Sequence, residues 1–177
     1  MLDDKRLLGE LKHGNNEALR QIYMEYKDNL LTIAVSLLHD PWAAEDVLHD
    51  VFVSFAAGVR GFKIRGTVKN YLIASVVNRA RDVFRRKKHH LVELDEAGPI
   101  AADSGDPQWS AAFSEDARLL TDALAQLPPD QRETIILHLT GGMKFREIAR
   151  MQGISISTVQ GRYRYGLEKL RAILKDG

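Results

Sequence analysis

Cysteine is absent from this chain of 177 residues, which excludes a disulfide scaffold, a thiolate zinc site and a catalytic cysteine. Long apolar runs are also absent, since the longest stretches fall far short of the ~18 residues that span a bilayer. The start of the chain, Met1–Arg6, opens with two acidic residues and lacks the apolar run of a secretory signal. We therefore expect a cytoplasmic globular protein with no membrane insertion.

Motifs of catalysis and metal binding are missing as well. The chain has no glycine-rich phosphate loop and no nucleophile motif. Its 6 histidines lack the spacing of metal ligands, apart from the adjacent His89 and His90. That pair lies in a basic run, where solvated side chains are the usual outcome. We expect a protein that is not an enzyme and that holds no cofactor and no metal.

Charge, in contrast, is abundant and segregated along the sequence. Residues 1–59 carry a net charge of −5, residues 60–90 of +9, residues 91–130 of −8 and residues 131–177 of +5. Solvated helix faces would explain a single modest charge run. A block as basic as residues 60–90 instead predicts a surface that contacts a polyanion, and the second basic block predicts another.

Apolar residues recur with helical spacing through most of the chain, and no alternation of period 2 predicts a strand. The spacing predicts helices over Asn16–Leu38, Pro41–Phe55 and Thr67–Lys88. Asp40 is a good N-cap for the second of these helices, and Pro41 suits its first position because the missing N–H costs nothing there.

The segment of residues 91–112 differs from its surroundings. It is acidic, contains proline and glycine, and lacks periodicity, which is typical of a linker. Helical periodicity returns from about Phe113 and continues past Pro128-Pro129 toward the end of the chain. We predict an all-α fold of two small helical domains, residues 1–90 and 113–177, joined by a flexible acidic linker of residues 91–112.

The strongest local pattern is a helix-turn-helix motif. Phe145–Met151 is predicted to form a short helix that ends where Gly153 takes the left-handed conformation. A second helix follows over Ser155–Leu170, with Ser155 or Ser157 as its cap. In such motifs the second helix enters the major groove, while an ordinary helical hairpin with a solvated polar face is the alternative. The outward side chains that suit base edges and phosphates are Ser157, Thr158, Gln160, Arg162 and Arg164.

The helix Pro41–Phe55 has an acidic face outside its apolar stripe. An acidic face with an exposed large apolar side chain predicts a basic, helical protein partner. A solvated acidic face is the alternative. The side chains on this face are Asp46, His49, Asp50 and Val53, with Phe52 near its edge.

The helix Thr67–Lys88 is strongly basic and follows a glycine-flanked loop that contains Phe62. Cations hold phosphates, while pockets and aromatic faces receive bases, so this combination predicts binding of a nucleic-acid strand whose bases leave the stack. Tyr71 and Phe84 fit the core as well as the surface. The candidate side chains are Phe62, Lys63, Arg65, Lys69, Asn70, Asn78, Arg79, Arg81, Arg85 and Arg86.

These residues together resemble a known family. The order Asp40-Pro41, Asp50-Val51-Phe52, Arg65-Gly66-Thr67 and Asn78-Arg79-Ala80-Arg81-Asp82 resembles region 2 of bacterial sigma factors. The order Leu127-Pro128-Pro129, Glu147-Ile148-Ala149, Gly153-Ile154-Ser155 and Thr158-Val159 resembles region 4. With only these two regions and a short linker, the chain looks like the small extracytoplasmic-function (ECF) group.

The resemblance implies a transcription initiation factor that directs polymerase to −35 and −10 promoter elements and promotes melting. Its implied partners are core RNA polymerase, through the largest-subunit clamp and the flap, promoter DNA and an anti-sigma factor. The implied polymerase-binding residues are Asp46, His49, Asp50, Phe52 and Val53. The implied −10 site comprises the ten side chains of the basic loop and helix named above, and the implied −35 site comprises Ser155, Ser157, Thr158, Gln160, Arg162 and Arg164.

The sequence departs from the family pattern at several positions. His49 stands where the family usually has Gln, and Val68 and Tyr71 stand where Phe and Trp are common. Lys144 replaces the usual Ser or Thr cap before Phe145, which predicts a helix start weaker by ~1 kcal/mol.

Two other classes of protein remain open from the sequence. One is a helical sensor domain fused to a helix-turn-helix regulator that binds duplex DNA as a dimer, and the other is a polymerase-binding adaptor that does not melt DNA. A sensor domain has no need of the +9 charge in residues 60–90, so this block is the feature that separates it from a sigma factor.

Overall fold

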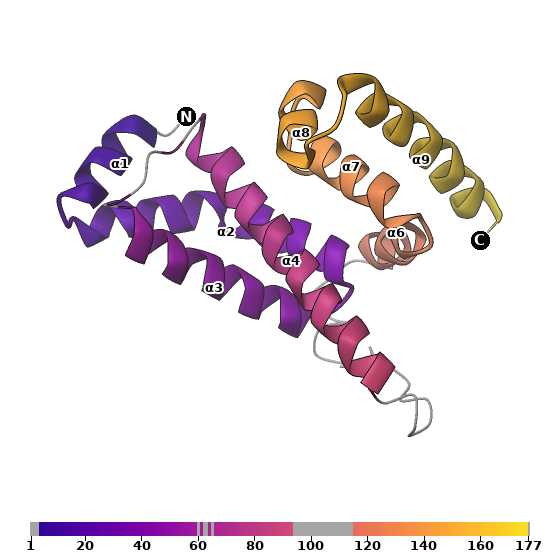
Figure 1. Ribbon diagram of the computed structural model, residues 1–177, viewed down its shortest axis with the longest axis horizontal. Helices are drawn as coiled ribbons and strands as arrows, with labels where there is room; N and C mark the ends of the chain where they lie inside the picture. Colours follow the sequence, from indigo (N-terminus) through magenta and orange to yellow (C-terminus); the bar gives the residue numbers. More distant parts are fainter. Residues whose placement is uncertain (1–3, 60, 62–63, 65, 94–114, 177) are drawn as a thin grey trace.

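The computed structural model describes residues 4–59, 61, 64, 66–93 and 115–176, which form two helical bodies (Figure 1). The N-terminal body consists of α1 (Asp4–Lys12), α2 (Asn16–Leu38), α3 (Pro41–Gly58) and α4 (Val68–Glu93). The C-terminal body consists of α6 (Glu115–Ala125), α7 (Pro129–Leu139), α8 (Phe145–Gln152) and α9 (Ile156–Asp176). No strand occurs within these ranges, and the predicted all-α class is confirmed.

Helix α3 begins as its sequence predicts. The Asp40 side chain accepts a hydrogen bond from the Ala43 backbone N–H at 3.0 Å, and Pro41 occupies the first turn. Helix α2 also has the predicted bounds. Helix α4 is longer than predicted and reaches Glu93, so helical backbone extends into the first residues of the predicted linker. The rest of that linker lies outside the described residues.

Helix α1 was not predicted. It is short, and its apolar residues are too few for a convincing periodicity. Leu7 and Leu11 are nevertheless buried, because α1 packs on α2 and gains its stability from this contact.

The core of the N-terminal body lies where α2, α3 and α4 pack on one another. Most of the apolar stripe of each helix is inside, although Tyr23 of α2 is 38% exposed. Each fully buried Leu, Ile or Phe contributes about 1.5–3 kcal/mol to the free energy of unfolding. The residues at the centre of this core include Ile22, Leu30, Ile33, Phe55, Leu72, Ile73 and Val76.

The C-terminal body is built around α7, which packs on α8 and α9. Ile136, Leu137, Ile148 and Val159 are almost fully buried there. Gly166 lets α9 approach α7 closely, because a Cβ at this position would lie 2.8 Å from the Ile135 Cδ1 atom.

The two bodies touch each other. Helices α6 and α7 pack on α2, and α7 and α8 reach α4 through side chains. Helix α3 lies on the side of the N-terminal body away from the C-terminal body (Figure 1).

Candidate nucleic-acid and protein interfaces

The outer face of α3 presents most of the side chains expected to meet a protein partner. Asp46, His49 and Asp50 are exposed, and Val53 is 54% exposed. Phe52 differs from the expectation of an exposed aromatic residue, because it is only 7% exposed and packs edge-to-face against Tyr23 with ring centroids 4.9 Å apart. Of the five predicted residues, Val53 is therefore the one with an exposed apolar side chain.

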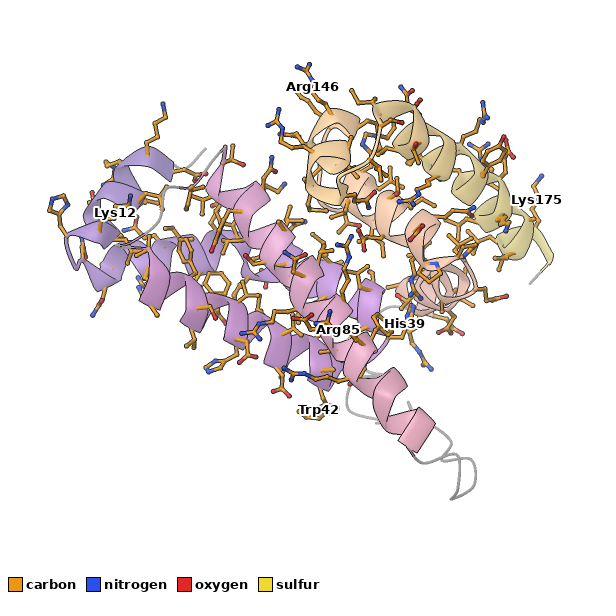
Figure 2. All side chains as sticks on the ribbon, viewed as in Figure 1. Lys12, His39, Trp42, Arg85, Arg146 and Lys175 are labelled. Carbon is orange, nitrogen blue, oxygen red and sulfur yellow. The ribbon has the colours of Figure 1, made fainter. Side chains whose placement is uncertain are left out.

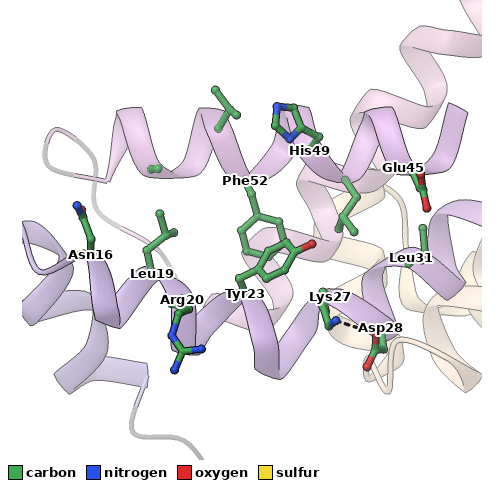
Figure 3. A pocket seen from close by; sticks show the side chains of 13 residues that line it. Asn16, Leu19, Arg20, Tyr23, Lys27, Asp28, Leu31, Glu45, His49 and Phe52 are labelled. Carbon is green, nitrogen blue, oxygen red and sulfur yellow. Dashed lines mark ion pairs between the residues drawn. The ribbon is translucent and has the colours of Figure 1, made fainter. Parts of the chain in front are cut away.

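A groove of about 760 Å³ runs between α2 and α3 beside this face (Figure 3). Its floor is apolar, and its rim carries charges that include an ion pair between Lys27 and Asp28 at 4.0 Å. Of the predicted residues, His49, Phe52 and Val53 line the groove, while Asp46 and Asp50 do not. The other lining residues are Asn16, Leu19, Arg20, Tyr23, Lys27, Asp28, Leu31, Glu45, Leu48 and Ala56.

The contribution of α2 to this groove was missed in the sequence. Leu19 and Tyr23 follow the helical spacing of the core stripe, so nothing in the pattern separates them from interior residues. In the structure they lie at the edge of the packing between α2 and α3, and Tyr23 is 38% exposed.

The basic helix α4 keeps part of its predicted DNA face open. Asn78, Arg85 and Arg86 are exposed, and Arg79 is half-buried. The Arg85 guanidinium lies 2.6 Å from the Asp82 carboxylate, one turn earlier on the helix. Three further candidates, Phe62, Lys63 and Arg65, lie outside the described residues.

The remaining candidates on α4 face the C-terminal body. Arg81 donates two hydrogen bonds to the Glu133 carboxylate on α7, from Nε at 3.0 Å and from Nη2 at 2.5 Å. Asn70 donates to Glu147 Oε1 on α8 at 2.7 Å. The Lys69 amino group is next to Gly142, 3.4 Å from where a Cβ would stand. The structure thus divides the predicted α4 site between an open part and a part in contact with α7 and α8.

Two of the positions where the chain departs from the family pattern, Val68 and Tyr71, pack inside the N-terminal body. Val68 is 1% exposed, and Tyr71 is half-buried with its ring 5.9 Å from that of Phe55. Phe84, in contrast, is 40% exposed and lies under the Arg132 guanidinium at 5.7 Å. Tyr71 therefore packs in the core of the N-terminal body, and Phe84 takes part in the contact between the two bodies.

The helix-turn-helix motif forms as predicted. Gly153 ends α8 in the left-handed conformation with φ 68°, and its N–H donates to the Ala149 carbonyl. Ser155, not Ser157, caps α9, because its Oγ accepts the Thr158 N–H at 3.0 Å. At the start of α8, where Lys144 cannot act as a cap, the Glu147 side chain accepts the Lys144 N–H at 2.7 Å and supplies half of a capping box.

Helix α9 presents most of the expected DNA-contacting side chains to solvent. Ser157, Thr158, Gln160 and Arg164 are exposed, and so is the capping Ser155. The Arg164 guanidinium stacks on the neighbouring Tyr165 ring at 4.8 Å. These side chains form one polar face on the first turns of the helix that follows the turn.

Arg162 is less exposed than its predicted outward placement implies. Its side chain is only 27% exposed, and Nη2 lies 2.6 Å from Asp130 Oδ2 at the start of α7. Its Nη1 also donates to Gln152 Oε1 on α8 at 3.3 Å. Position 162 lies at the border of the polar face of α9, and its side chain reaches the exposed carboxylate of Asp130 on α7.

Within the described residues, no cluster of three or more His, Cys, Asp or Glu side chains has the geometry to hold a metal ion. The same part of the chain contains no helix that is long and apolar enough to cross a membrane.

Comparison with known proteins assigns both bodies. The chain matches Sigma-70 region 2 over residues 22–90 and Sigma-70 region 4 over residues 117–170. RNA polymerase sigma factor CarQ of Myxococcus xanthus is 29% identical over 170 residues, which cover 93% of this chain and 94% of the relative. ECF RNA polymerase sigma factor SigW of Bacillus subtilis is 25% identical and covers 97% of both chains.

The fold agrees with a solved structure of this kind. The sigma factor RpoE of Bartonella quintana, crystallised with the anti-sigma factor NepR, has a TM-score of 0.74 at 24% identity over 88% of this chain and 96% of that one. A body with region 2 followed by a body with region 4 defines a sigma factor, a non-enzymatic transcription initiation factor that works with core RNA polymerase on promoter DNA. This chain belongs to the ECF sigma factor family. A sensor domain fused to a helix-turn-helix regulator is not favoured.

Proposed function

We propose that this sigma factor binds the clamp of the largest polymerase subunit through the outer face of α3 and the groove between α2 and α3. Its −10 site is then formed by α4 and the preceding loop, and its −35 site by the first turns of α9. The domains proposed to carry these roles are residues 1–90 and 113–177.

The observation that carries the polymerase site is an acidic face beside an apolar groove. Asp46 and Asp50 are exposed on the same helix as Val53, and His49 and Val53 line the groove. Complementary charge speeds association and disfavours wrong partners, while apolar burial supplies affinity. A partner helix that carries basic and apolar side chains would match both the acidic face and the apolar groove.

The proposed DNA sites are supported by charge and by helix geometry. Helix α4 exposes Arg85 and Arg86, which suit the phosphates of a separated strand. Helix α9 exposes Gln160 and Arg164 near its N-terminal end, as expected for a recognition helix in the major groove. The proposed role of Arg162 is a phosphate contact at the border of this face.

An anti-sigma factor is a further proposed partner. The support is the structure of RpoE with NepR, which has the same fold as this chain. Because core polymerase works in the cytoplasm, we propose that compartment for this protein.

The polymerase site is tested by charge reversal on α3. We expect Asp46→Lys and Asp50→Lys each to weaken binding to core polymerase at least about tenfold, because each places a cation against a basic partner. Fluorescence anisotropy of the labelled full chain with core polymerase, without DNA, measures this loss. Promoter-directed transcription should fall in parallel.

Glu25→Lys is the matched control, because Glu25 is exposed on α2 and does not line the groove. It should bind polymerase as the unchanged chain does. Unaltered affinity in the Asp46→Lys, Asp50→Lys double variant, with circular dichroism confirming the fold, would exclude α3 as the docking face.

A further inference from the structure

Helix α3 carries a second large apolar side chain that is exposed, at its start. Trp42, in the first turn after the Asp40 cap, is 55% exposed, almost the same fraction as Val53 further along the helix. Tryptophan is well buried in most proteins, yet a single exposed one, scattered on a surface, would need no explanation. Trp42 is not scattered in this sense, because it shares a helix face with residues of the proposed polymerase site.

The spacing of these residues places them in one line along α3. Asp46, His49 and Val53 follow Trp42 by about one, two and three turns of an α-helix. The four side chains therefore lie within about 60° of one another around the helix axis, and each of them is exposed. The two apolar members stand at the ends of this line, about 16 Å apart along the axis. We call the four residues the α3 stripe.

The stripe extends the docking surface beyond the groove between α2 and α3. His49 and Val53 line that groove, whereas Trp42 does not. Figure 2 shows the Trp42 side chain pointing away from the C-terminal body, at the end of α3 opposite to Val53. A partner that covers the whole stripe therefore needs an elongated segment, such as a helix laid along α3.

The chemistry of Trp42 suits the same basic partner that the carboxylates of α3 favour. An indole ring attracts a Lys or Arg head group over its face, and its apolar area can cover the methylene stem of that side chain. Exposed carboxylates contribute little affinity by themselves, because water and salt screen their charge. Tryptophan, in contrast, is among the residues that most often dominate the affinity of a protein interface.

The charges nearest to Trp42 on α3 disfavour DNA as the occupant. Glu45 and Asp46 are both exposed about one turn from Trp42. Two carboxylates beside the indole ring repel a phosphate backbone and attract a cationic protein segment. A basic protein partner is therefore the occupant that both the ring and its surroundings fit.

We propose that Trp42 is an anchor of the polymerase-docking surface, which extends along α3 from Trp42 to Val53 and receives a Lys or Arg side chain of the polymerase on the indole ring. The carboxylates of α3 then speed the encounter, and Trp42 slows the dissociation of the complex. This inference rests on the proposed role of α3 in polymerase docking.

The test replaces Trp42 in the full chain and measures binding to core polymerase without DNA. We expect Trp42→Ala to raise the Kd at least about tenfold, mainly through faster dissociation. Stopped-flow fluorescence anisotropy of the labelled chain measures the association and dissociation rates separately. Trp42→Phe keeps an aromatic face and should lose less affinity than Trp42→Ala does.

Salt separates the effect of the anchor from that of the carboxylates. Asp46→Lys should act mainly on the association rate, and its effect should shrink as the salt concentration rises from about 0.1 M to about 0.5 M, because screening shortens the reach of exposed charges. The loss in Trp42→Ala should persist at the higher salt concentration, since contacts buried under a partner are screened much less.

Met24→Ala is the matched control. Met24 is 54% exposed on α2 and does not line the groove, so this variant removes a comparable apolar side chain away from the α3 stripe. It should bind core polymerase as the unchanged chain does. Circular dichroism verifies that Trp42→Ala keeps its helices, as expected for a side chain that is more than half exposed.

The outcomes distinguish failure of this inference from failure of the proposed function. Unchanged affinity and dissociation rate in Trp42→Ala would overturn the anchor. If the Asp46→Lys, Asp50→Lys double variant still loses affinity in that case, α3 remains the docking face; if it does not, that assignment is wrong as well. Normal polymerase binding by Trp42→Ala combined with weaker promoter binding by the assembled complex would assign Trp42 to DNA instead.

Discussion

At the scale of single residues, three of the cations proposed to meet DNA have carboxylate neighbours in the structure. Arg85 lies beside Asp82, Arg81 beside Glu133 and Arg162 beside Asp130. Exposed ion pairs of this kind contribute only ~0–1 kcal/mol to stability, so DNA can replace the carboxylate at small cost. Glu133, at 12% exposure, is the most enclosed of these three acids and the hardest to displace.

Arg162 allows this exchange to be measured. If its guanidinium contacts a phosphate, Arg162→Ala should weaken binding to a −35 duplex by ~1–3 kcal/mol and reduce the salt dependence by about one phosphate contact. The duplex is selected from random-sequence DNA with the full chain and core polymerase, and affinity is measured over a salt titration.

Asp130→Asn is the matched variant. It keeps Arg162 and removes the negative charge of the carboxylate that lies 2.6 Å from Arg162 Nη2. It should bind the same duplex at least as tightly as the unchanged chain does. Full affinity and an unchanged salt slope in Arg162→Ala would remove Arg162 from the −35 site.

At the scale of elements, the turn between α8 and α9 sets the direction of the recognition helix. Gly153 holds φ 68° there, a backbone conformation that a side chain with a Cβ rarely adopts. Gly161, inside α9, has helical backbone and no heavy atom within 4 Å of where a Cβ would stand. Replacing glycine by alanine is therefore expected to lower the free energy of unfolding at position 153 and to raise it at position 161.

Gly153→Ala should lower the free energy of unfolding of the C-terminal body by ~1–2 kcal/mol, since it forces a left-handed conformation on alanine. Gly161→Ala should raise it by ~0.5–1 kcal/mol, because glycine inside a helix is costly. Urea unfolding followed by circular dichroism measures both changes. Equal effects of the two substitutions would contradict the assigned turn.

At the scale of the whole molecule, the junction between the bodies contains a titratable group. His39 ends α2 with φ 52°, and its ring lies where α2 meets the C-terminal body (Figure 2). Burial, together with the positive charge of Arg132 on α7, lowers the pKa of His39, and Asp122 on α6 opposes this effect. Burial likewise lowers the pKa of Arg132. Packing of the C-terminal body against α2 therefore favours a neutral His39.

Acid should separate the two bodies. The molecule with its two bodies packed together binds fewer protons than it does with the bodies apart. The stabilisation of this contact is therefore present above the ordinary histidine pKa of about 6.5 and is lost as the pH falls below that value. A protonated ring also cannot accept a hydrogen bond from Arg132. The radius of gyration from small-angle scattering should rise between about pH 7 and pH 5.5.

His39→Asn is the control for this titration, because asparagine tolerates a positive φ and does not ionise. Its radius of gyration should stay constant over the same pH range. If the radius of gyration of His39→Asn rises at the same pH as that of the unchanged chain, a titratable group other than His39 separates the two bodies.

The sequence by itself determined most of the helices, α1 excepted, and the family. Asp40-Pro41 predicted the start of α3, and Gly153 followed by Ser155 predicted the turn before the recognition helix. Both predictions hold because caps and turns depend on residues within one helical turn of each other. The apolar stripes of α2, α3 and α4 were predictable for the same reason, since period and burial face follow from local spacing.

Only the tertiary structure decided how each helix face is used. Phe52 is covered by Tyr23 of α2 and Val53 is not, although the two are adjacent in sequence. Arg81 meets Glu133, which lies 52 positions away along the chain. Periodicity places a side chain on a face, but which neighbour covers that face depends on packing between elements distant in sequence, and that information is absent from any local window.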